Sequence, residues 1–175
     1  MTTRTGLMVI DVQTCYLEKY KDQKMVEDCI NTINSYTSTA HKKNIPIIYI
    51  EHEFKGFFTR LFMQLCQGGM GINGSKKFPT DNRINILTYD MALKSEGNSF
   101  SSSKVLKWIK DHKINELLIC GQDGAHCVNS TAIGALELKL KTVLLENAII
   151  STNMNKWCKK KESLINSGAE FKPDI

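Results

Sequence analysis

The feature that most constrains the fold is a series of short apolar runs that alternate with helix-like segments. Apolar runs cover residues 6–10, 47–50, 117–120 and 142–145, and two further strand-like segments cover residues 84–93 and 169–172. Continuous apolar runs of this length are typical of strands buried on both faces of a parallel sheet. Between them, apolar residues recur at three- and four-residue steps, as over residues 24–43, which indicates amphipathic helices. This alternation predicts a three-layer αβα sandwich with a mainly parallel, Rossmann-like sheet of about six strands.

The chain has 175 residues, and no linker, repeat or low-complexity stretch divides it. We therefore expect one domain over residues 1–175. The six cysteines show no CxxC spacing, so they predict neither a zinc site of that kind nor a disulfide framework. Reduced thiols, the lack of a recognisable signal peptide and the lack of an apolar run of ~20 residues favour a cytoplasmic protein with no membrane partner.

The formal net charge of +5 raises the question of a nucleic-acid partner. The lysines are spread along the chain except for the run at residues 159–161, which falls in a polar, helix-like segment. A solvated helix face explains this run better than a binding patch does. We therefore expect no nucleic-acid partner, while a preference for an anionic substrate stays open.

Residues 117–132 combine an apolar strand, a glycine-containing turn and the start of a helix. Cys127 falls at this helix start, where backbone N–H groups and the positive end of the helix dipole favour a thiolate and can bind an oxyanion. The alternative is that Cys127 is a small buried apolar residue, as most free cysteines are. The ends of the other predicted strands bear on this choice.

Asp11 directly follows the run at residues 6–10, and Lys94 stands at the end of the segment at residues 84–93. Asp11 could equally cap a helix, and Lys94 could point into water. Ligands of open parallel sheets bind at the carboxyl ends of the strands, where we expect Asp11, Lys94 and Cys127 to meet. The carboxylate can take the thiol proton, the ammonium group can stabilise both anions, and the thiolate can attack a carbonyl group.

Residues 51–53, with the sequence Glu-His-Glu, end the second predicted strand. Alternating carboxylate and imidazole groups can coordinate zinc or iron. Because no second histidine follows before His112, we favour a polar strand end over a metal site.

The segment at residues 54–83 shows a short helical pattern with one apolar face near residues 57–65, and then a glycine-rich loop at residues 68–74. The loop lacks the spacing of a phosphate-binding motif, and we interpret it as a substrate cover. Its apolar residues could instead serve core packing or a subunit interface.

At these residues the sequence resembles the cysteine hydrolase superfamily that includes isochorismatases, nicotinamidases and N-carbamoylsarcosine amidohydrolases. Residues 7–13 resemble the first strand of that family, which ends in Asp-x-Gln. Residues 94–100 resemble its Lys-x-x-x-Ser-Ala-Phe segment, with Asn98-Ser99 in place of Ser-Ala. Residues 121–128 resemble its Gly-Val-x-Thr-Asp-x-Cys-Val turn. The resemblance covers nearly the whole chain, with matching order and spacing.

The resemblance implies a catalytic triad with Asp11 as general base, Lys94 as electrostatic partner and Cys127 as the nucleophile. A covalent acyl intermediate on the cysteine is then hydrolysed by water. The resemblance also implies a cis peptide bond between Gln122 and Asp123, and oxyanion donors from the backbone N–H groups of Asp123 and Cys127.

Gln13 and His126 are candidate substrate-binding residues. Family members are commonly dimers or tetramers, so we expect a homo-oligomer. Gly124-Ala125 stands where the family commonly has Thr-Asp, which leaves the substrate contacts of the turn open. Nicotinamidases carry a metal-binding Asp-x-His and a later histidine, whereas this chain has Glu-His-Glu at residues 51–53; we therefore expect neither a required metal nor another cofactor.

Together these features predict a metal-independent cysteine hydrolase of a small amide, carbamoyl or isochorismate-like substrate. A first alternative is a non-catalytic binding or interaction protein with the same fold. A second is a thiol redox sensor in which Cys127 pairs with Cys120 or Cys15.

Overall fold

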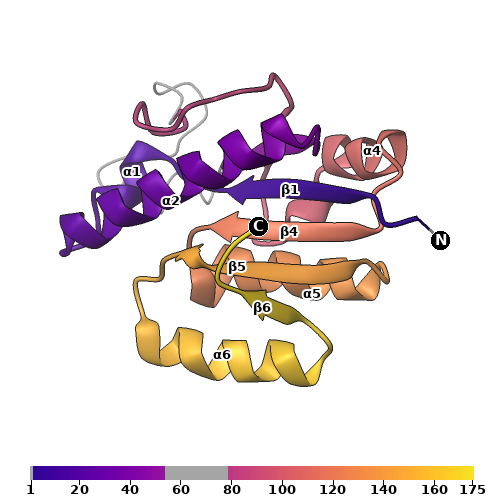
Figure 1. The fold of residues 1–175 in the computed structure, drawn as a ribbon. Coiled ribbons are helices and arrows are strands. Elements are labelled where there is room, and N and C mark those ends of the chain that lie inside the picture. Colours follow the sequence, from indigo (N-terminus) through magenta and orange to yellow (C-terminus); the bar gives the residue numbers. More distant parts are fainter. Residues whose placement is uncertain (1, 54–78) are drawn as a thin grey trace.

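The structure, a computed structural model, describes residues 2–53 and 79–175, and these residues form a six-stranded parallel sheet (Figure 1). The strand order is β3-β2-β1-β4-β5-β6, which places β1 and β4 at the centre. The strands are β1 (Thr5–Ile10), β2 (Ile47–His52), β3 (Met91–Lys94), β4 (Glu116–Gly121), β5 (Lys141–Ile149) and β6 (Glu170–Lys172).

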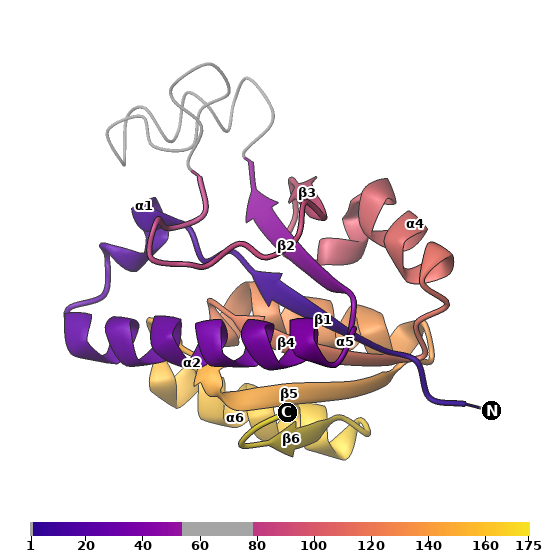
Figure 2. The same cartoon turned by 45° about the horizontal axis from the view of Figure 1, so that its top comes forward.

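Helices cover both faces of this sheet, as Figures 1 and 2 show. The helical elements are α1 (Thr14–Leu17), α2 (Gln23–Lys42), the 3₁₀ turn η1 (Ser99–Ser101), α4 (Ser103–Asp111), the π-helical turn η2 (Gly124–Val128), α5 (Asn129–Glu137) and α6 (Met154–Asn166). The long α2 packs on one face, and α4, α5 and α6 pack on the other. The predicted three-layer α/β architecture with a parallel sheet is therefore confirmed. None of the helices within the described ranges combines the length and apolar character that a membrane span needs.

The continuous apolar runs are explained by two separate cores. Along β1, Leu7 and Val9 point to the core beneath α2, whereas Met8 and Ile10 point to the core beneath α4, α5 and α6. Successive side chains of a strand face opposite sides of the sheet, so both sets must be apolar when both faces are covered.

Two strand boundaries differ from the prediction. The third strand, predicted at residues 84–93, begins only at Met91, and residues 84–90 follow an irregular path. Side chains take the place of strand pairing there, because Thr88 Oγ1 donates to Ile47 O at 3.0 Å and Tyr49 OH donates to Asn85 O at 3.1 Å. Strand β5 continues beyond the predicted end at residue 145, with a register shift against β4. The helix and loop predicted near residues 57–65 and 68–74 lie outside the described residues.

Gly134 lies in α5 where this helix passes over η1. A β-carbon at Gly134 would come within 2.5 Å of Asn98 Nδ2, and the Asn98 side chain caps η1 by accepting from Phe100 N at 3.0 Å. A glycine-to-alanine change inside a helix ordinarily stabilises it by about 1 kcal/mol. Here the lost cap and the overpacking cost about 2–3 kcal/mol together. We expect Gly134→Ala to lower the free energy of unfolding by about 1–2 kcal/mol, measured by urea denaturation.

The exposed Ile133 on the same helix gives the matched control. Ile133→Ala is expected to change the free energy of unfolding by less than about 1 kcal/mol, because Ile133 is 41% exposed and does not lie in the core. A Gly134→Ala variant as stable as the parent protein would contradict the tight contact with Asn98.

Candidate active site

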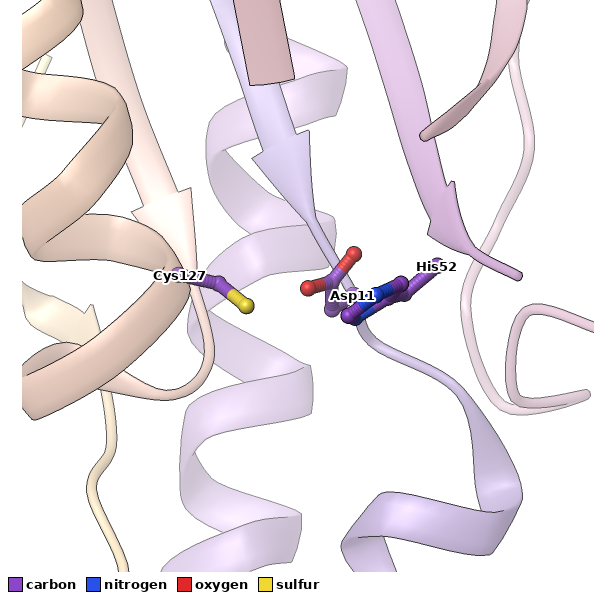
Figure 3. A group of neighbouring side chains, drawn as sticks. All are labelled: Asp11, His52 and Cys127. Atoms are coloured by element: carbon purple, nitrogen blue, oxygen red, sulfur yellow. The ribbon is translucent and has the colours of Figure 1, made fainter. Parts of the chain in front are cut away.

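The carboxyl ends of four neighbouring strands bring together Lys94, His52, Asp11 and Cys127. Lys94 ends β3, His52 ends β2, Asp11 follows β1, and Cys127 lies in the turn η2 after β4. Adjacent strands are ~5 Å apart, so side chains from these ends can reach one another. Figure 3 shows Asp11, His52 and Cys127 turned toward a common space. The three side chains that strand ends predicted to meet, those of Asp11, Lys94 and Cys127, lie in one site.

Lys94 and Asp11 form a buried ion pair. Lys94 Nζ lies 2.8 Å from Asp11 Oδ2, and the two side chains are 0% and 2% exposed. The same ammonium group donates to the carbonyl oxygens of Glu96 at 3.1 Å and Gly97 at 3.2 Å. Three oxygens thus match the three donors of a lysine, which fixes its position. The alternative of a lysine pointing into water is wrong.

The backbone at Asp11 has an uncommon conformation, with φ at 51°. This left-handed region is rare for residues other than glycine, although aspartate tolerates it better than most. Residues held in such conformations concentrate at functional sites. The conformation ends β1 abruptly and presents the Asp11 carboxylate to the site.

Gly121 begins the turn that carries Cys127. Its φ is +116°, and a β-carbon there would lie 2.2 Å from Ile10 O, so only glycine fits beside β1. The next peptide bond, between Gln122 and Asp123, is cis, at the position that the family resemblance implies. The buried Gln122 side chain donates to Asp11 O at 2.9 Å and accepts from Tyr20 OH at 3.0 Å. The turn is therefore tied directly to the end of β1.

The carboxylate of Asp123 holds the other side of the turn. It accepts hydrogen bonds from Ala125 N and Thr152 N, each at 2.9 Å, and from the Ser151 hydroxyl group. Burial alone would raise the pKa of Asp123, but the hydrogen bonds from Ser151 and Thr152 outweigh it and hold the pKa below its usual value. Sequence reasoning assigned Asp123 through its backbone N–H group and missed this side-chain role. The available signal was an aspartate at a helix start, a preferred N-cap residue.

Cys127 lies in the π-helical turn η2 rather than in the first turn of α5. Val128 N donates to Asp123 O at 3.1 Å, a hydrogen bond that spans five residues, and α5 begins only at Asn129. Single π turns inside helices are frequent at functional sites. The widened turn directs the Cys127 side chain toward Asp11, as Figure 3 shows.

The surroundings of Cys127 favour the protonated thiol, the direction opposite to the one expected from a helix start. Burial raises the pKa of Cys127 to about 12, and the negative charge of Asp11 adds to this effect. The positive charge of Lys94 acts in the opposite direction and is outweighed. The resting site therefore contains a neutral thiol next to a carboxylate that is able to accept its proton.

The reactivity of Cys127 toward iodoacetamide tests this electrostatic balance. Only the thiolate reacts, so the alkylation rate should keep rising with pH up to about 12. Asp11→Asn removes a negative charge and should lower the pKa of Cys127, giving faster alkylation near neutral pH. Lys94→Met removes a positive charge and should raise the pKa, giving slower alkylation. Mass spectrometry of the Cys127 peptide measures both rates.

Cys158 is exposed on α6 and provides an internal reference for the reagent in each sample. Its alkylation rate should be the same in the parent protein and both variants. Equal Cys127 rates in all three proteins would contradict the electrostatic coupling.

His52 lies in the site, which sequence reasoning did not predict. Its imidazole groups with Asp11 and Cys127, and the ligand atoms of the three residues all lie within 4.8 Å of one another. The interpretation of residues 51–53 as a polar strand end rather than a metal site stays a prediction. Burial and the positive charge of Lys94 lower the pKa of His52, whereas the Asp11 charge and a hydrogen bond with the Ser95 backbone oppose this shift. The imidazole is therefore neutral at neutral pH.

The other residues of this strand end do not fit the nicotinamidase metal motif. Glu51 accepts hydrogen bonds from Thr80 N at 2.8 Å and Thr80 Oγ1 at 3.0 Å, so its carboxylate is bound to another segment of the same chain. The sequence also has no histidine between residues 53 and 111 to complete such a set. No catalytic step is therefore assigned to a metal at this position.

The two predicted substrate-binding residues have different surroundings. Gln13 is buried, and its side-chain Oε1 accepts from His52 N at 2.8 Å, so this amide holds the end of β2 beside the site. His126 is exposed, and its Nε2 lies 3.3 Å from Lys156 Nζ on α6. Gln13 therefore lies next to the site and contacts the backbone of His52. The His126 ring lies beside α6.

Tyr16 is a further neighbour of the site that sequence reasoning missed. Its ring centroid lies 6.4 Å from that of His52, and its pKa is raised by burial and by the negative charge of Asp11. It comes from the short helix α1, which no periodic pattern marks in the sequence. The phenol places an aromatic ring with a polar hydroxyl group beside His52.

Cys120, one of the two predicted redox partners of Cys127, lies on the opposite face of the sheet from Cys127. Cys120 is fully buried in the core beneath α2, whereas Cys127 packs against the core beneath α4, α5 and α6. A disulfide requires Cα atoms within ~7 Å and β-carbons that point toward each other. This arrangement argues against a Cys120–Cys127 redox pair.

The fold and the site define a Rossmann-like α/β protein with a cysteine beside a buried lysine–aspartate pair. The sequence profile of the isochorismatase domain matches residues 5–171, and the chain belongs to the isochorismatase family. The isochorismatase family protein YddQ of Bacillus subtilis is 22% identical over 155 residues, which span 86% of this chain and 79% of YddQ.

Solved structures show the same fold at low sequence identity. An isochorismatase family protein from Desulfovibrio vulgaris superimposes with a TM-score of 0.84 at 13% identity, covering 97% of this chain and 94% of that protein. The pyrazinamidase of Pyrococcus horikoshii, solved in complex with zinc, gives 0.79 at 16% identity with 97% and 98% covered. The N-carbamoylsarcosine amidase of Thermoplasma acidophilum gives 0.79 at 16% identity with 97% and 96% covered.

Proposed function

We propose that the protein is a cysteine hydrolase in which Cys127 is the nucleophile, Asp11 the general base and Lys94 the electrostatic partner. The observation that carries this proposal is the buried Lys94–Asp11 ion pair at 2.8 Å, next to a thiol whose proton the Asp11 carboxylate can accept. Burying two charges costs several kcal/mol for each ion, and only good ion-pair geometry with additional hydrogen bonds offsets this cost. A nucleophile beside a base that is itself oriented by a third group is the recurrent arrangement of covalent catalysis.

For an amide or carbamoyl substrate, the first chemical step forms an acyl-enzyme. Asp11 takes the proton from the Cys127 thiol as the sulfur attacks the substrate carbonyl carbon, and the carbonyl oxygen becomes an oxyanion. Backbone N–H groups of Asp123 and Cys127 are the proposed donors to this oxyanion, a contribution of about 3 kcal/mol in comparable sites. Collapse of the tetrahedral intermediate breaks the bond to the leaving group, which takes the proton from Asp11.

The second step releases the product. Asp11, again ionised, takes a proton from a water molecule that attacks the thioester carbon. The carbon–sulfur bond breaks, the acid leaves, and the proton returns from Asp11 to the sulfur. Lys94 keeps Asp11 in place through both steps, and its charge stabilises the carboxylate whenever the thiol is protonated.

The proposed substrate is a small amide, carbamoyl or isochorismate-like compound. Relatives of the same fold include a pyrazinamidase and an N-carbamoylsarcosine amidase, whose names indicate cleavage of small amide or carbamoyl groups. Catalysis is proposed to need no metal, because the carboxylate and the thiol complete the reaction between them. We also propose a cytoplasmic homo-oligomer.

Non-catalytic binding on the same fold is the second candidate, favoured by Gly124-Ala125 in the turn before Cys127. The structure gives Gly124 a packing reason, since a β-carbon there would lie 2.8 Å from the Trp157 ring. Ala125 is buried, and its N–H group donates to Asp123. This local change in the turn is thus compatible with a working nucleophile.

A substrate panel separates the two candidates. The purified protein is incubated with pyrazinamide, nicotinamide, N-carbamoylsarcosine and isochorismate while ammonia or acid release is measured, and intact mass spectrometry detects acylated Cys127. Turnover of any panel member together with an acyl adduct on Cys127 supports the hydrolase. A panel member that binds equally to the parent protein and to Cys127→Ser, with no turnover and no adduct, would establish the binding protein instead.

A further inference from the structure

Asp11, His52 and Cys127 bring three different metal-ligating groups to one point. The carboxylate oxygen, imidazole nitrogen and thiol sulfur all lie within 4.8 Å of one another, and Figure 3 shows the three side chains converging from three elements. The proposed catalytic steps use Asp11 and Cys127 but assign nothing to His52. The position of the His52 imidazole next to the proposed nucleophile is therefore not explained by these steps.

This set of ligand atoms suits a thiophilic divalent cation. Zinc binds oxygen, nitrogen and sulfur ligands at ~2.0–2.3 Å, so a tetrahedral ion separates its ligand atoms by about 3.3–3.7 Å. The ligand atoms of Asp11, His52 and Cys127, all within 4.8 Å of one another, must come closer together to reach that geometry. A sulfur ligand excludes magnesium and calcium, which take oxygen ligands.

The burial and charge of Asp11 favour a cation. Asp11 is 1% exposed; its Oδ2 pairs with Lys94, whereas its Oδ1 has no hydrogen-bond partner among the described residues. A buried carboxylate oxygen without a partner is costly, and a metal ion would satisfy it. His52 supports the site because its imidazole adds a nitrogen ligand within reach of the Asp11 carboxylate and the Cys127 sulfur. The Lys94 charge opposes the cation, so binding should be reversible and weaker than at a structural zinc site.

We propose that Asp11, His52 and Cys127 form an inhibitory binding site for a thiophilic divalent cation, with Zn²⁺ as the test ion. On binding, the sulfur–hydrogen bond of Cys127 breaks, the proton goes to solvent, and a sulfur–zinc bond forms without change of oxidation state. The bound ion occupies both the nucleophile and the general base, with a fourth position open to water. Inhibition rests on the proposed hydrolase function, whereas binding of the ion does not.

Cobalt(II) provides a spectroscopic test that needs no substrate. Co²⁺ added to the metal-free protein should give a thiolate-to-cobalt charge-transfer band that Cys127→Ser abolishes and equimolar Zn²⁺ displaces. His52→Ala should weaken Zn²⁺ binding by about 100-fold or more, because even residues behind metal ligands contribute 10–100-fold. His52→Asn, a closer match in size, should weaken it in the same way if the alanine variant folds poorly.

His112→Ala and Cys158→Ser are the matched controls, since they remove a partly exposed histidine and an exposed cysteine away from the site. Both should bind Zn²⁺ like the parent protein. Zn²⁺ should also protect Cys127, but not Cys158, from iodoacetamide. The absence of a charge-transfer band, unchanged Zn²⁺ affinity in both His52 variants, or no protection of Cys127 would each overturn the site. These readouts use resting protein, so a failed metal site leaves the substrate panel intact, and a failed panel leaves metal binding measurable.

Discussion

Cys127→Ala is expected to lower kcat/KM by at least about 10⁴-fold on any substrate that the panel identifies, because it removes the proposed nucleophile and with it the proposed covalent route. The substrate binding and the backbone donors that remain account for residual activity of the kind seen when a triad member is deleted. Steady-state kinetics of ammonia or acid release measures this change. The variant should fold normally, because alanine removes only a partly buried sulfur atom.

Cys158→Ser is the control for loss of a cysteine as such. Its side chain is exposed on α6, so kcat/KM should match that of the parent protein. A Cys127→Ala variant with activity within tenfold of the parent would remove Cys127 from the chemical step.

Lys94→Met is expected to reduce the free energy of unfolding by about 3–5 kcal/mol, because it leaves the Asp11 carboxylate buried without its cation. Both side chains of the pair are at most 2% exposed, so water does not replace the lost partner. The backbone oxygens of Glu96 and Gly97 lose their donor as well. Urea denaturation followed by circular dichroism measures the difference.

The double variant Asp11→Asn/Lys94→Met separates the charge effect from lost packing. It should recover a substantial part of the stability, since neither a buried anion nor a buried cation remains without a partner. Lys107→Met provides the surface comparison, because Lys107 pairs with Asp111 on the exposed side of α4 and should contribute less than about 0.5 kcal/mol. Equal losses for Lys94→Met and Lys107→Met would contradict the buried pair.

The sequence was sufficient to predict the architecture and the meeting of Asp11, Lys94 and Cys127. Strands that are buried on both faces appear in the sequence as apolar runs. A polar residue immediately after such a run lies at the carboxyl edge of the sheet. The length of β3 could not be predicted from the sequence. Residues 84–90 are apolar enough for a strand, yet side chains such as Thr88 and Tyr49, rather than a strand ladder, satisfy the local backbone.

The direction of His52, the partners of Asp123 and the pKa of Cys127 could not be predicted from the sequence, because they depend on contacts between segments that are far apart in the chain. The direction of His52 follows from the register of β2 on β1, in which Ile50 pairs with Ile10. It also follows from the hydrogen bond that the His52 backbone N–H group donates to the Gln13 side chain. The carboxylate partners of Asp123 come from the end of another strand, β5. The raised pKa of Cys127 reflects burial, which becomes known only when the whole turn is placed.

The residues of the site come from the ends of β3, β2, β1 and β4, and this distribution affects how the protein behaves during synthesis and proteolysis. Asp11 emerges early in synthesis and Cys127 late, and no contiguous segment contains a working pair of groups. Their proximity depends on the parallel pairing of four strands, each separated in sequence from its neighbour by a crossover. Nascent chains and proteolytic fragments should therefore be inert, and catalytic activity should report completed assembly of the entire central sheet.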